Sequence, residues 1–359
     1  MNNFNQKIPN GWSVKKLGEL GEFSKGTGIT KNDLVETGLP CIRYAELYTR
    51  YDFIIKKAVS FISADIAKQA VKIDKGTLVL AGSGETKEDI GKSASYEADE
   101  PAYVGGDAII FLPEKEMNAI FLSYFLNTAG RRQLNSLGQG DSIVHIHSAH
   151  LKNVLIPVPP LAEQEKIAEI LGTWDLAIEK LTALIEQKKL LKKGLMQRLL
   201  TGKQRLPGFS TPWNKVKLKN ICDISKGEQL GRLEMTETGV YPVINGGISK
   251  SGLTDSYNRE KDTITISEGG NSCGFVAFMK ERFWCGGHCY ALSNLQTNLH
   301  FLFQILKSKE SDIMKLRVGS GLPNIQKSSL DAFSLHIPTD ISEQKAIANI
   351  LSKADEEIT

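Results

Sequence analysis

Several features that mark membrane, secreted or strongly charged proteins are missing from this sequence. No apolar run approaches the roughly 20 residues that a membrane-spanning helix needs, and the N-terminal stretch MNNFNQKIPNGW lacks the apolar core of a signal peptide. The chain has only five cysteines among 359 residues, at irregular spacings, which favours reduced thiols. Because the formal net charge is only +3, overall charge does not indicate a nucleic-acid partner. We expect a cytoplasmic, globular protein of two domains with no membrane contact.

Proline is also absent from the stretch 163–200, and the only glycines there are Gly172 and Gly194. Apolar side chains recur three and four residues apart through this stretch, with Lys188 the one break, at Ile167, Ile170, Trp174, Ala177, Leu181, Leu184, Leu191 and Leu195. This spacing is typical of a helix that pairs with another helix along a heptad seam. The stretch predicts a helical rod of about 55 Å between two large blocks of chain.

The chain repeats itself. Residues 163–178 match residues 343–358 at several positions, including the Glu-Gln pairs 163–164 and 343–344 and the aspartates Asp175 and Asp355. The two blocks also begin alike, because Trp12 and Trp213 lie equally far before a Ser-Lys-Gly turn, at 24–26 and at 225–227. A long internal repeat is the signature of a duplicated architecture. Two helix starts in one register predict an intramolecular helix pair.

Both blocks then continue in the same order. Each has a strand that runs into a glycine-rich loop (76–85 and 262–271), a second glycine pair (104–108 and 285–289) and a helical segment (118–137 and 298–316). This order predicts an α+β protein built from two mixed α/β domains. Because the scaffold repeats while many loop residues differ, the two blocks are expected to recognise different targets.

Two stretches carry a resemblance to a known family. The first is IPVPPLAEQ at 156–164, which runs into Ile167, Ile170 and Leu171, and the second is KGLMQRLLTGK at 193–203. Together with the duplicated order, they resemble the specificity (S) subunit of type I restriction–modification systems. The resemblance covers the whole chain, except that the second helix is much shorter than the first.

The resemblance implies a domain plan and a set of partners. It implies target-recognition domains at 1–158 and 207–338, each reading one half of a bipartite double-stranded DNA site. A central helix at 159–206 and the start of a C-terminal helix at 339–359 would pair as an antiparallel coiled coil with pseudo-twofold symmetry, acting as ruler and docking site. Two modification (methyltransferase) subunits and additional restriction (endonuclease and translocase) subunits would bind. S-adenosylmethionine, ATP and Mg would be held by those partners, and no cofactor or metal by this chain.

Candidate site residues follow from this plan. Lysine and arginine can read guanine, and asparagine and glutamine can read adenine. The expected DNA-binding residues lie in the matched loops of the two blocks: Lys25, Arg43, Ser83, Glu85, Lys87, Lys92, His145 and His147 in the first, and Lys226, Arg232, Asn245, Asn271, Ser272, Arg317, Asn324 and Gln326 in the second. For each residue taken singly, an ordinary solvated surface is the alternative. The expected helix-pairing residues are Ile167, Ile170, Leu171, Trp174, Leu181, Leu184, Leu191, Leu195, Ile347, Ile350 and Leu351.

Other apparent motifs are weaker. The stretch 84–93 resembles a phosphate-binding loop but has six residues between its glycines where four are needed. Cys285, His288 and Cys289 resemble a zinc site, but the matching stretch 104–108 offers no such ligands. The basic cluster along residues 188–205 fits a solvated helix face and a phosphate-facing patch equally well.

No catalytic centre is evident in the sequence. It has no Asn-Pro-Pro-aromatic or Asp-Pro-Pro-aromatic motif of the kind that adenine methyltransferases use, and no glycine-rich fingerprint for S-adenosylmethionine. We therefore expect a non-catalytic DNA-recognition subunit. The alternatives are a specificity subunit of a methyltransferase-only system, a coiled-coil scaffold that binds no DNA and, with least support, a standalone methyltransferase.

Overall fold

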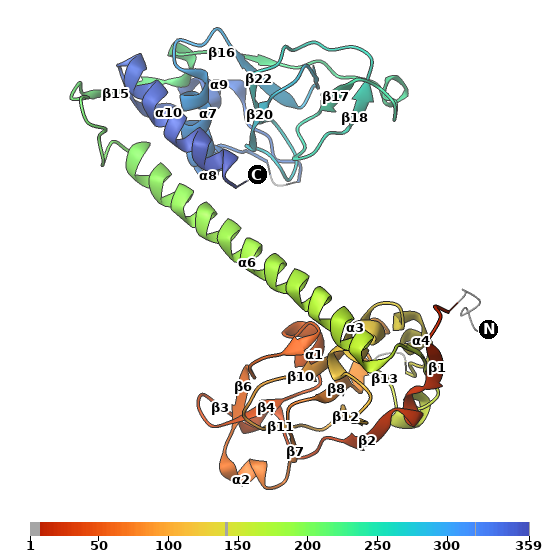
Figure 1. The fold of residues 1–359 in the computed structure, drawn as a ribbon. Coiled ribbons are helices and arrows are strands. Elements are labelled where there is room, and N and C mark those ends of the chain that lie inside the picture. The colour runs from red at the N-terminus through yellow and green to blue at the C-terminus, as the bar shows by residue number, and fades with distance from the viewer. Residues whose placement is uncertain (1–7, 141–142, 320, 359) are drawn as a thin grey trace. The chain divides into compact units, whose positions relative to one another are not determined.

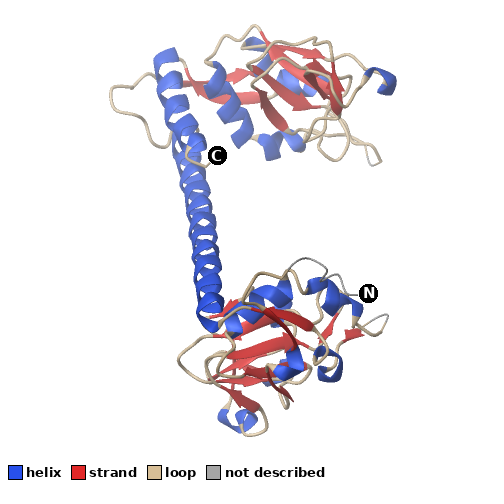
Figure 2. Ribbon diagram, turned by 45° about the vertical axis from the view of Figure 1, so that its right-hand side comes forward, coloured by secondary structure: helices blue, strands red, loops and turns tan. Residues whose placement is uncertain are grey.

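The computed structural model describes residues 8–140, 143–319 and 321–358. They fall into two compact units, Met1–Glu179 and Lys180–Thr359, here called the first and second unit (Figure 1). Both units combine small sheets with short helices, as Figure 2 shows by colour. The mixed α/β fold expected from the repeated order of elements is therefore confirmed.

The first unit contains two five-stranded sheets. One has the order β2-β12-β8-β10-β5 and the other the order β3-β6-β4-β11-β7. Most neighbours are antiparallel, but β10·β5 and β11·β4 are parallel. The strands are β2 (Gly21–Lys25), β3 (Leu34–Val35), β4 (Leu39–Ile42), β5 (Ile54–Ile55), β6 (Ser60–Ile62), β7 (Val71–Ile73), β8 (Thr77–Ala81), β10 (Ser93–Tyr96), β11 (Ala102–Val104) and β12 (Ala108–Pro113).

Smaller elements complete the first unit. Strand β1 (Ser13–Lys16) pairs with β14 (Leu155–Val158), and β9 (Ser83–Gly84) pairs with β13 (Val144–His145). The helices are α1 (Glu46–Thr49), α2 (Ala64–Ala67), α3 (Ala119–Asn127), α4 (Arg131–Ser136) and α5 (Ser148–Leu151), with 3-10 turns η1 (Leu17–Glu19) and η2 (Lys31–Asp33). Helix α3 packs its apolar side chains against strands β8 and β10, and together they enclose the larger core of this unit.

The second unit repeats this plan with fewer strands. Its sheets have the orders β16-β22-β19-β20, β18-β17-β21 and β15-β23. The strands are β15 (Trp213–Lys217), β16 (Asp223–Lys226), β17 (Tyr241–Ile244), β18 (Gly252–Thr254), β19 (Thr263–Ser267), β20 (Val276–Met279), β21 (Trp284–Cys285), β22 (Cys289–Ser293) and β23 (Ser334–Pro338). The helices are α7 (Leu299–Ser308), α8 (Glu310–Met314), α9 (Lys327–Ala332) and α10 (Ile341–Glu356), with 3-10 turns η3 (Leu218–Asn220) and η4 (Arg232–Glu234).

Helix α6 (Leu161–Leu199) is the long helix expected from the proline-free stretch. Its 39 residues correspond to a length of about 58 Å. The boundary between the two units falls inside it, so its first half packs with the first unit and its second half with the second.

One buried glutamine fixes the start of this helix, and the start of α10 is fixed in the same way. The Oε1 atom of Gln164 accepts a hydrogen bond from the backbone N–H of Asn118 at 2.9 Å, and its Nε2 donates to the carbonyl of Pro159 at 2.9 Å. Gln344 makes the equivalent bonds with Asn298 and Pro338, at 2.8 and 2.9 Å. The internal repeat therefore extends to individual hydrogen bonds.

The two tryptophans that open the blocks hold the same helix starts. The indole N–H of Trp12 donates to the Glu163 carboxylate at 3.1 Å, and that of Trp213 donates to Glu343 at 3.4 Å. Glu343 is buried and also accepts two hydrogen bonds from Arg205, whereas Glu163 is exposed. Each tryptophan thus anchors the start of the helix in its own unit.

Within the second unit, the end of α6 pairs with α10. Lys188 forms an ion pair with Glu357 at 2.5 Å, and Lys192 pairs with Asp355. Because the residue numbers rise along one helix as they fall along the other, this pair is antiparallel, as expected. Leu195 packs against the apolar core of the second unit, which includes the α10 side chains Ile347 and Leu351. At these lysines, the basic cluster serves helix pairing.

Candidate nucleic-acid interface

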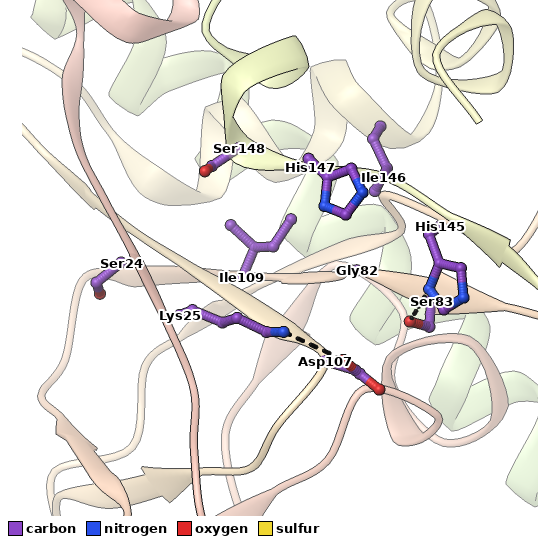
Figure 3. Close-up of a pocket in the computed structure, with 10 residues that line it drawn as sticks. All are labelled: Ser24, Lys25, Gly82, Ser83, Asp107, Ile109, His145, Ile146, His147 and Ser148. Atoms are coloured by element: carbon purple, nitrogen blue, oxygen red, sulfur yellow. Dashed lines mark hydrogen bonds and ion pairs between the residues drawn. The ribbon is translucent and has the colours of Figure 1, made fainter. Parts of the chain in front are cut away.

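In the first unit, several segments bring polar side chains together beside β2, at one edge of the sheet β2-β12-β8-β10-β5. The end of β2, the loop after β8, the residue before β12, strand β13 and the start of α5 line one shallow pocket (Figure 3). Its polar side chains come from positions far apart in the sequence: Ser24, Lys25, Ser83, Asp107, His145, His147 and Ser148. Four of the eight residues proposed for this unit, Lys25, Ser83, His145 and His147, therefore share one site.

His145 is oriented by a buried serine. Strands β9 and β13 place Ser83 opposite His145, and the Ser83 hydroxyl lies 2.8 Å from His145 Nδ1. Ser83 itself is buried, so its hydroxyl positions the exposed histidine. Burial alternates along 144–147, since Val144 and Ile146 are buried and the two histidines are exposed. The strand nevertheless ends at His145, and His147 is the residue that precedes helix α5.

Across the pocket, Lys25 faces an acidic side chain. Its Nζ lies 3.3 Å from Oδ1 of Asp107, as Figure 3 shows by a dashed line. The backbone of Asp107 has a φ of 60°, a left-handed conformation that aspartate adopts more readily than most residues. The turn between β11 and β12 thus points this carboxylate toward the end of β2.

Arg131 in α4 hydrogen-bonds to the backbone of the loop between β9 and β10. One guanidinium nitrogen donates to the carbonyl of Glu88 at 2.7 Å and also to the carbonyl of Ile90. Burial lowers the pKa of Arg131, against the opposing effect of nearby carboxylates. On this loop Glu85 and Lys87 are exposed and Lys92 is half-buried, so Arg131 fixes the backbone that presents them.

Arg43 differs from the other proposed contacts in the first unit. Its Nε and Nη2 atoms donate to the buried carboxylate of Glu46, at 3.1 and 2.9 Å. The hydroxyl of Ser60 donates to the same carboxylate at 2.6 Å. The arginine head group thus takes part in a local polar network that organises the start of α1.

The second unit has an equivalent site with different side chains. Backbone bonds establish the equivalence, because Glu268 N–H donates to the His288 carbonyl just as Gly82 N–H donates to the Asp107 carbonyl. Lys226 Nζ lies 2.6 Å from Oε1 of Glu268, and His288 Nδ1 lies 3.3 Å from Oε2 of the same carboxylate.

Tyr290 also contacts the Glu268 carboxylate of this network. Its hydroxyl donates to the carbonyl of Ile325 at 3.0 Å and lies 3.5 Å from Glu268. Burial, with a smaller contribution from the Glu268 charge, raises the pKa of Tyr290 to about 12. The hydroxyl therefore stays neutral at physiological pH and serves as a donor.

The remaining proposed residues of the second unit lie around this network. Gln326 Nε2 donates to Asn324 Oδ1 at 3.0 Å, and these two occupy the positions of His147 and His145. Asn245 Oδ1 accepts from the His288 N–H at 3.3 Å. The hydroxyl of Ser272 donates to a backbone carbonyl, and three proposed residues are exposed on neighbouring segments: Arg232, Asn271 and Arg317.

Comparison with known proteins decides the family. The model of the type I restriction modification DNA specificity domain matches residues 9–188 and again residues 211–359. The chain belongs to this family. Both matches coincide closely with the two repeated blocks of the sequence, each taken with its helix start.

Individual members of the specificity family are similar over different lengths. A Mycoplasma genitalium protein named as a type I specificity subunit is 37% identical over 149 residues, which is 41% of this chain and 39% of that protein. The type I restriction enzyme MjaVIII specificity subunit of Methanocaldococcus jannaschii is 23% identical over 97% of this chain and 87% of its own length. The chain thus spans about two fifths of the first relative and most of the second.

A solved structure supports the fold of this specificity-family protein. The S subunit of a type I restriction–modification system from M. genitalium matches with a TM-score of 0.74, at 20% identity, over 99% of this chain and 92% of that one. At this identity the likeness establishes the fold alone.

The apolar residues proposed for helix pairing lie in different environments along α6 and α10. Ile167 packs against the core of the first unit, and Leu195 packs against the core of the second. Between them, the following seam residues are exposed: Ile170, Leu171, Trp174, Leu181, Leu184 and Leu191. On α10, Ile347 and Leu351 are buried and Ile350 is partly buried, all in the core of the second unit.

Sequence reasoning missed several residues of the two candidate sites. Asp107, Glu268, His288 and Arg131 were not proposed as contacts, although three of them lie in the matched glycine-rich stretches. Comparing the charged residues of 104–108 and 285–289 could have singled out the first and third. Among residues 8–140, 143–319 and 321–358, no helix is long and apolar enough to cross a membrane, and no acidic, cysteine and histidine side chains are grouped as metal ligands.

Proposed function

We propose that this chain is the DNA-recognition subunit of a type I restriction–modification complex and that each unit reads one half of a bipartite site. The observation that carries the proposal is the doubled site. The two sites share several backbone hydrogen bonds, yet at equivalent points one presents His145 and His147 and the other Asn324 and Gln326. A common frame with different polar side chains is what two different base sequences require.

In this proposal helix α6 is the ruler between the half-sites and a docking site for two modification subunits. Its length of about 58 Å supports the first role. Exposed apolar side chains, Trp174 and Leu184 among them, support the second role, because covering apolar surface with a partner lowers the free energy of the complex. Restriction subunits would join the same complex and cut unmethylated DNA.

The chain itself is proposed to be non-catalytic. Its task is to bind and orient DNA, while S-adenosylmethionine is held by the modification subunits, and ATP and Mg by the restriction subunits. A specificity subunit of a methyltransferase-only system would use the same two sites. The exposed seam of α6 also suits a scaffold that binds proteins and no DNA, so this second function is tested directly.

The test is methylome sequencing of a host that expresses this chain with its cognate modification subunit. The expected result is a methylated-adenine motif of two short halves separated by a fixed unspecified gap. Replacing residues 1–158 with the matching block of another family member should change one half only. A continuous motif, or none at all with a demonstrably active modification subunit, would overturn the two-reader proposal and favour the scaffold.

A further inference from the structure

Each unit places a lysine beside a carboxylate at the same point of its fold. Lys25 ends β2 and Lys226 ends β16. The two lysines are equivalent, because the glycine after each donates its N–H to the first residue of the neighbouring strand, Ala108 in β12 or Cys289 in β22. Their Nζ atoms lie 3.3 Å from Asp107 and 2.6 Å from Glu268, respectively.

The two carboxylates, however, come from different positions of the repeat. Asp107 occupies the position of His288, and Glu268 occupies the position of Gly82. The first unit supplies the acid from the turn before β12, whereas the second unit supplies it from the loop after β19. The duplicated fold therefore builds the same donor and acceptor pair in two ways.

Stability does not account for this arrangement in the first unit. The side chains of Lys25 and Asp107 are 67% and 50% exposed, and an exposed ion pair contributes little to folding. A lysine that faces a carboxylate is also a poor contact for phosphate, since the acid repels the backbone of DNA. Both facts point to the base edges as the partner.

The chemistry of a G·C base pair matches such a pair. Guanine presents the acceptors N7 and O6 in the major groove, and cytosine presents the donor N4. O6 and N4 are joined by a Watson–Crick hydrogen bond, so they lie about 2.9 Å apart. A lysine nitrogen and a carboxylate oxygen separated by 2.6 to 3.3 Å can meet both atoms at once.

We propose that the Lys25–Asp107 and Lys226–Glu268 pairs each read one G·C base pair, with lysine on guanine and the carboxylate on the N4 amino group of cytosine. This inference rests on the proposed function. A T·A pair offers an acceptor and a donor in the same order but has no N7 beside the acceptor and adds a methyl group, so it ranks second. The C·G and A·T pairs reverse the order and are rejected, each by about 5- to 150-fold in affinity relative to G·C.

The decisive variant exchanges the two side chains in the second unit, Lys226→Glu with Glu268→Lys. It keeps the ion pair but reverses donor and acceptor, so one position of the second half-site should change from G·C to C·G. The measurements are the methylome motif of the assembled complex and competition binding with four duplexes that differ only at that position. The first half-site serves as an internal control.

The matched control is Arg282→Glu with Glu260→Arg, which exchanges an exposed pair 2.9 Å apart in the same unit and should leave the motif unchanged. Because Glu268 is only 13% exposed, the Glu268→Lys replacement can disturb folding, so Lys25→Met tests the first unit at an exposed side chain. It should lower the preference for G·C at one position of the first half-site by about 5- to 150-fold.

The outcomes separate this inference from the proposed function. A folded exchange variant, or Lys25→Met, that keeps the parental motif and the parental ranking of the four duplexes would overturn the reading of G·C. That result would leave two-reader recognition intact. Absence of a bipartite motif for the parental protein would instead overturn the proposed function, and the inference with it.

Discussion

The buried carboxylate at the start of α10 gives a sharp test of how the second unit is held together. Glu343 is 1% exposed at its side chain and accepts hydrogen bonds from Arg205 Nε and Nη2, at 2.7 and 2.8 Å. The indole of Trp213 adds a longer contact at 3.4 Å. Replacing Arg205 with alanine leaves the carboxylate buried without its cation.

Removing one partner of a buried ion pair costs about 3–5 kcal/mol, because the remaining charge is desolvated and uncompensated. We expect the lower end, about 3 kcal/mol, since Arg205 is 28% exposed and water can enter the space it leaves. That loss corresponds to an increase of about 150-fold in the population of the opened second unit.

Native-state hydrogen exchange is the suitable assay, because a chain of two units need not unfold in a single step. Amides of β15 and α10 should exchange about 150-fold faster in Arg205→Ala, while those of the first unit keep their rates. Glu163 provides the matched control, since it occupies the same helix position but is exposed. Glu163→Ala should change protection by less than about 1 kcal/mol.

A second comparison isolates the charge. The double variant Arg205→Met with Glu343→Leu removes both charged groups at similar volume and should recover most of the lost protection. If Arg205→Ala changes protection by less than about 1 kcal/mol, or if the double variant is as unstable as the single one, burial of an unpaired charge is not what the arginine prevents.

Three further predictions concern caps, loops and thiols. Asn118→Ala and Asn298→Ala should each lower the stability of their helix by about 1 kcal/mol, because each asparagine side chain accepts a hydrogen bond from the backbone N–H three residues later. Hydrogen exchange in α3 and α7 measures this loss, and equal protection in parent and variant would count against capping. Arg131→Lys should loosen residues 87–91 and weaken binding to the first half-site only, and weakening at both half-sites in parallel binding assays would contradict a local role. Burial raises the pKa of Cys41 and of Cys222 to about 12, so iodoacetamide at pH 8 should modify them only after unfolding. Because the folded state keeps these thiols neutral, their contribution to the free energy of unfolding is fully present below the ordinary pKa of about 8.5 and is lost as pH rises toward 12. A series of denaturation curves at alkaline pH would measure this loss.

The sequence by itself determined the long helix, the duplication and the order of elements. A proline-free stretch with apolar residues three and four apart can satisfy its backbone hydrogen bonds locally, so helix α6 could be predicted from it. The repeat was equally visible, because Gln164 and Gln344 recur with the same neighbours. Each glutamine accepts a hydrogen bond from a backbone N–H 46 residues earlier, that of Asn118 or of Asn298, and only the folded chain shows these contacts.

Only the tertiary structure decided which side chains meet. Lys25 and Asp107 are far apart in sequence, and no periodicity predicts that a turn with a left-handed aspartate brings them within 3.3 Å. Glu268 and Gly82 occupy the same point of the repeat, so matching the two blocks residue by residue conceals that both units build one kind of ion pair. Local patterns fix local backbone, but polar contacts across a sheet edge depend on strand order and register, which are set by packing of the whole unit.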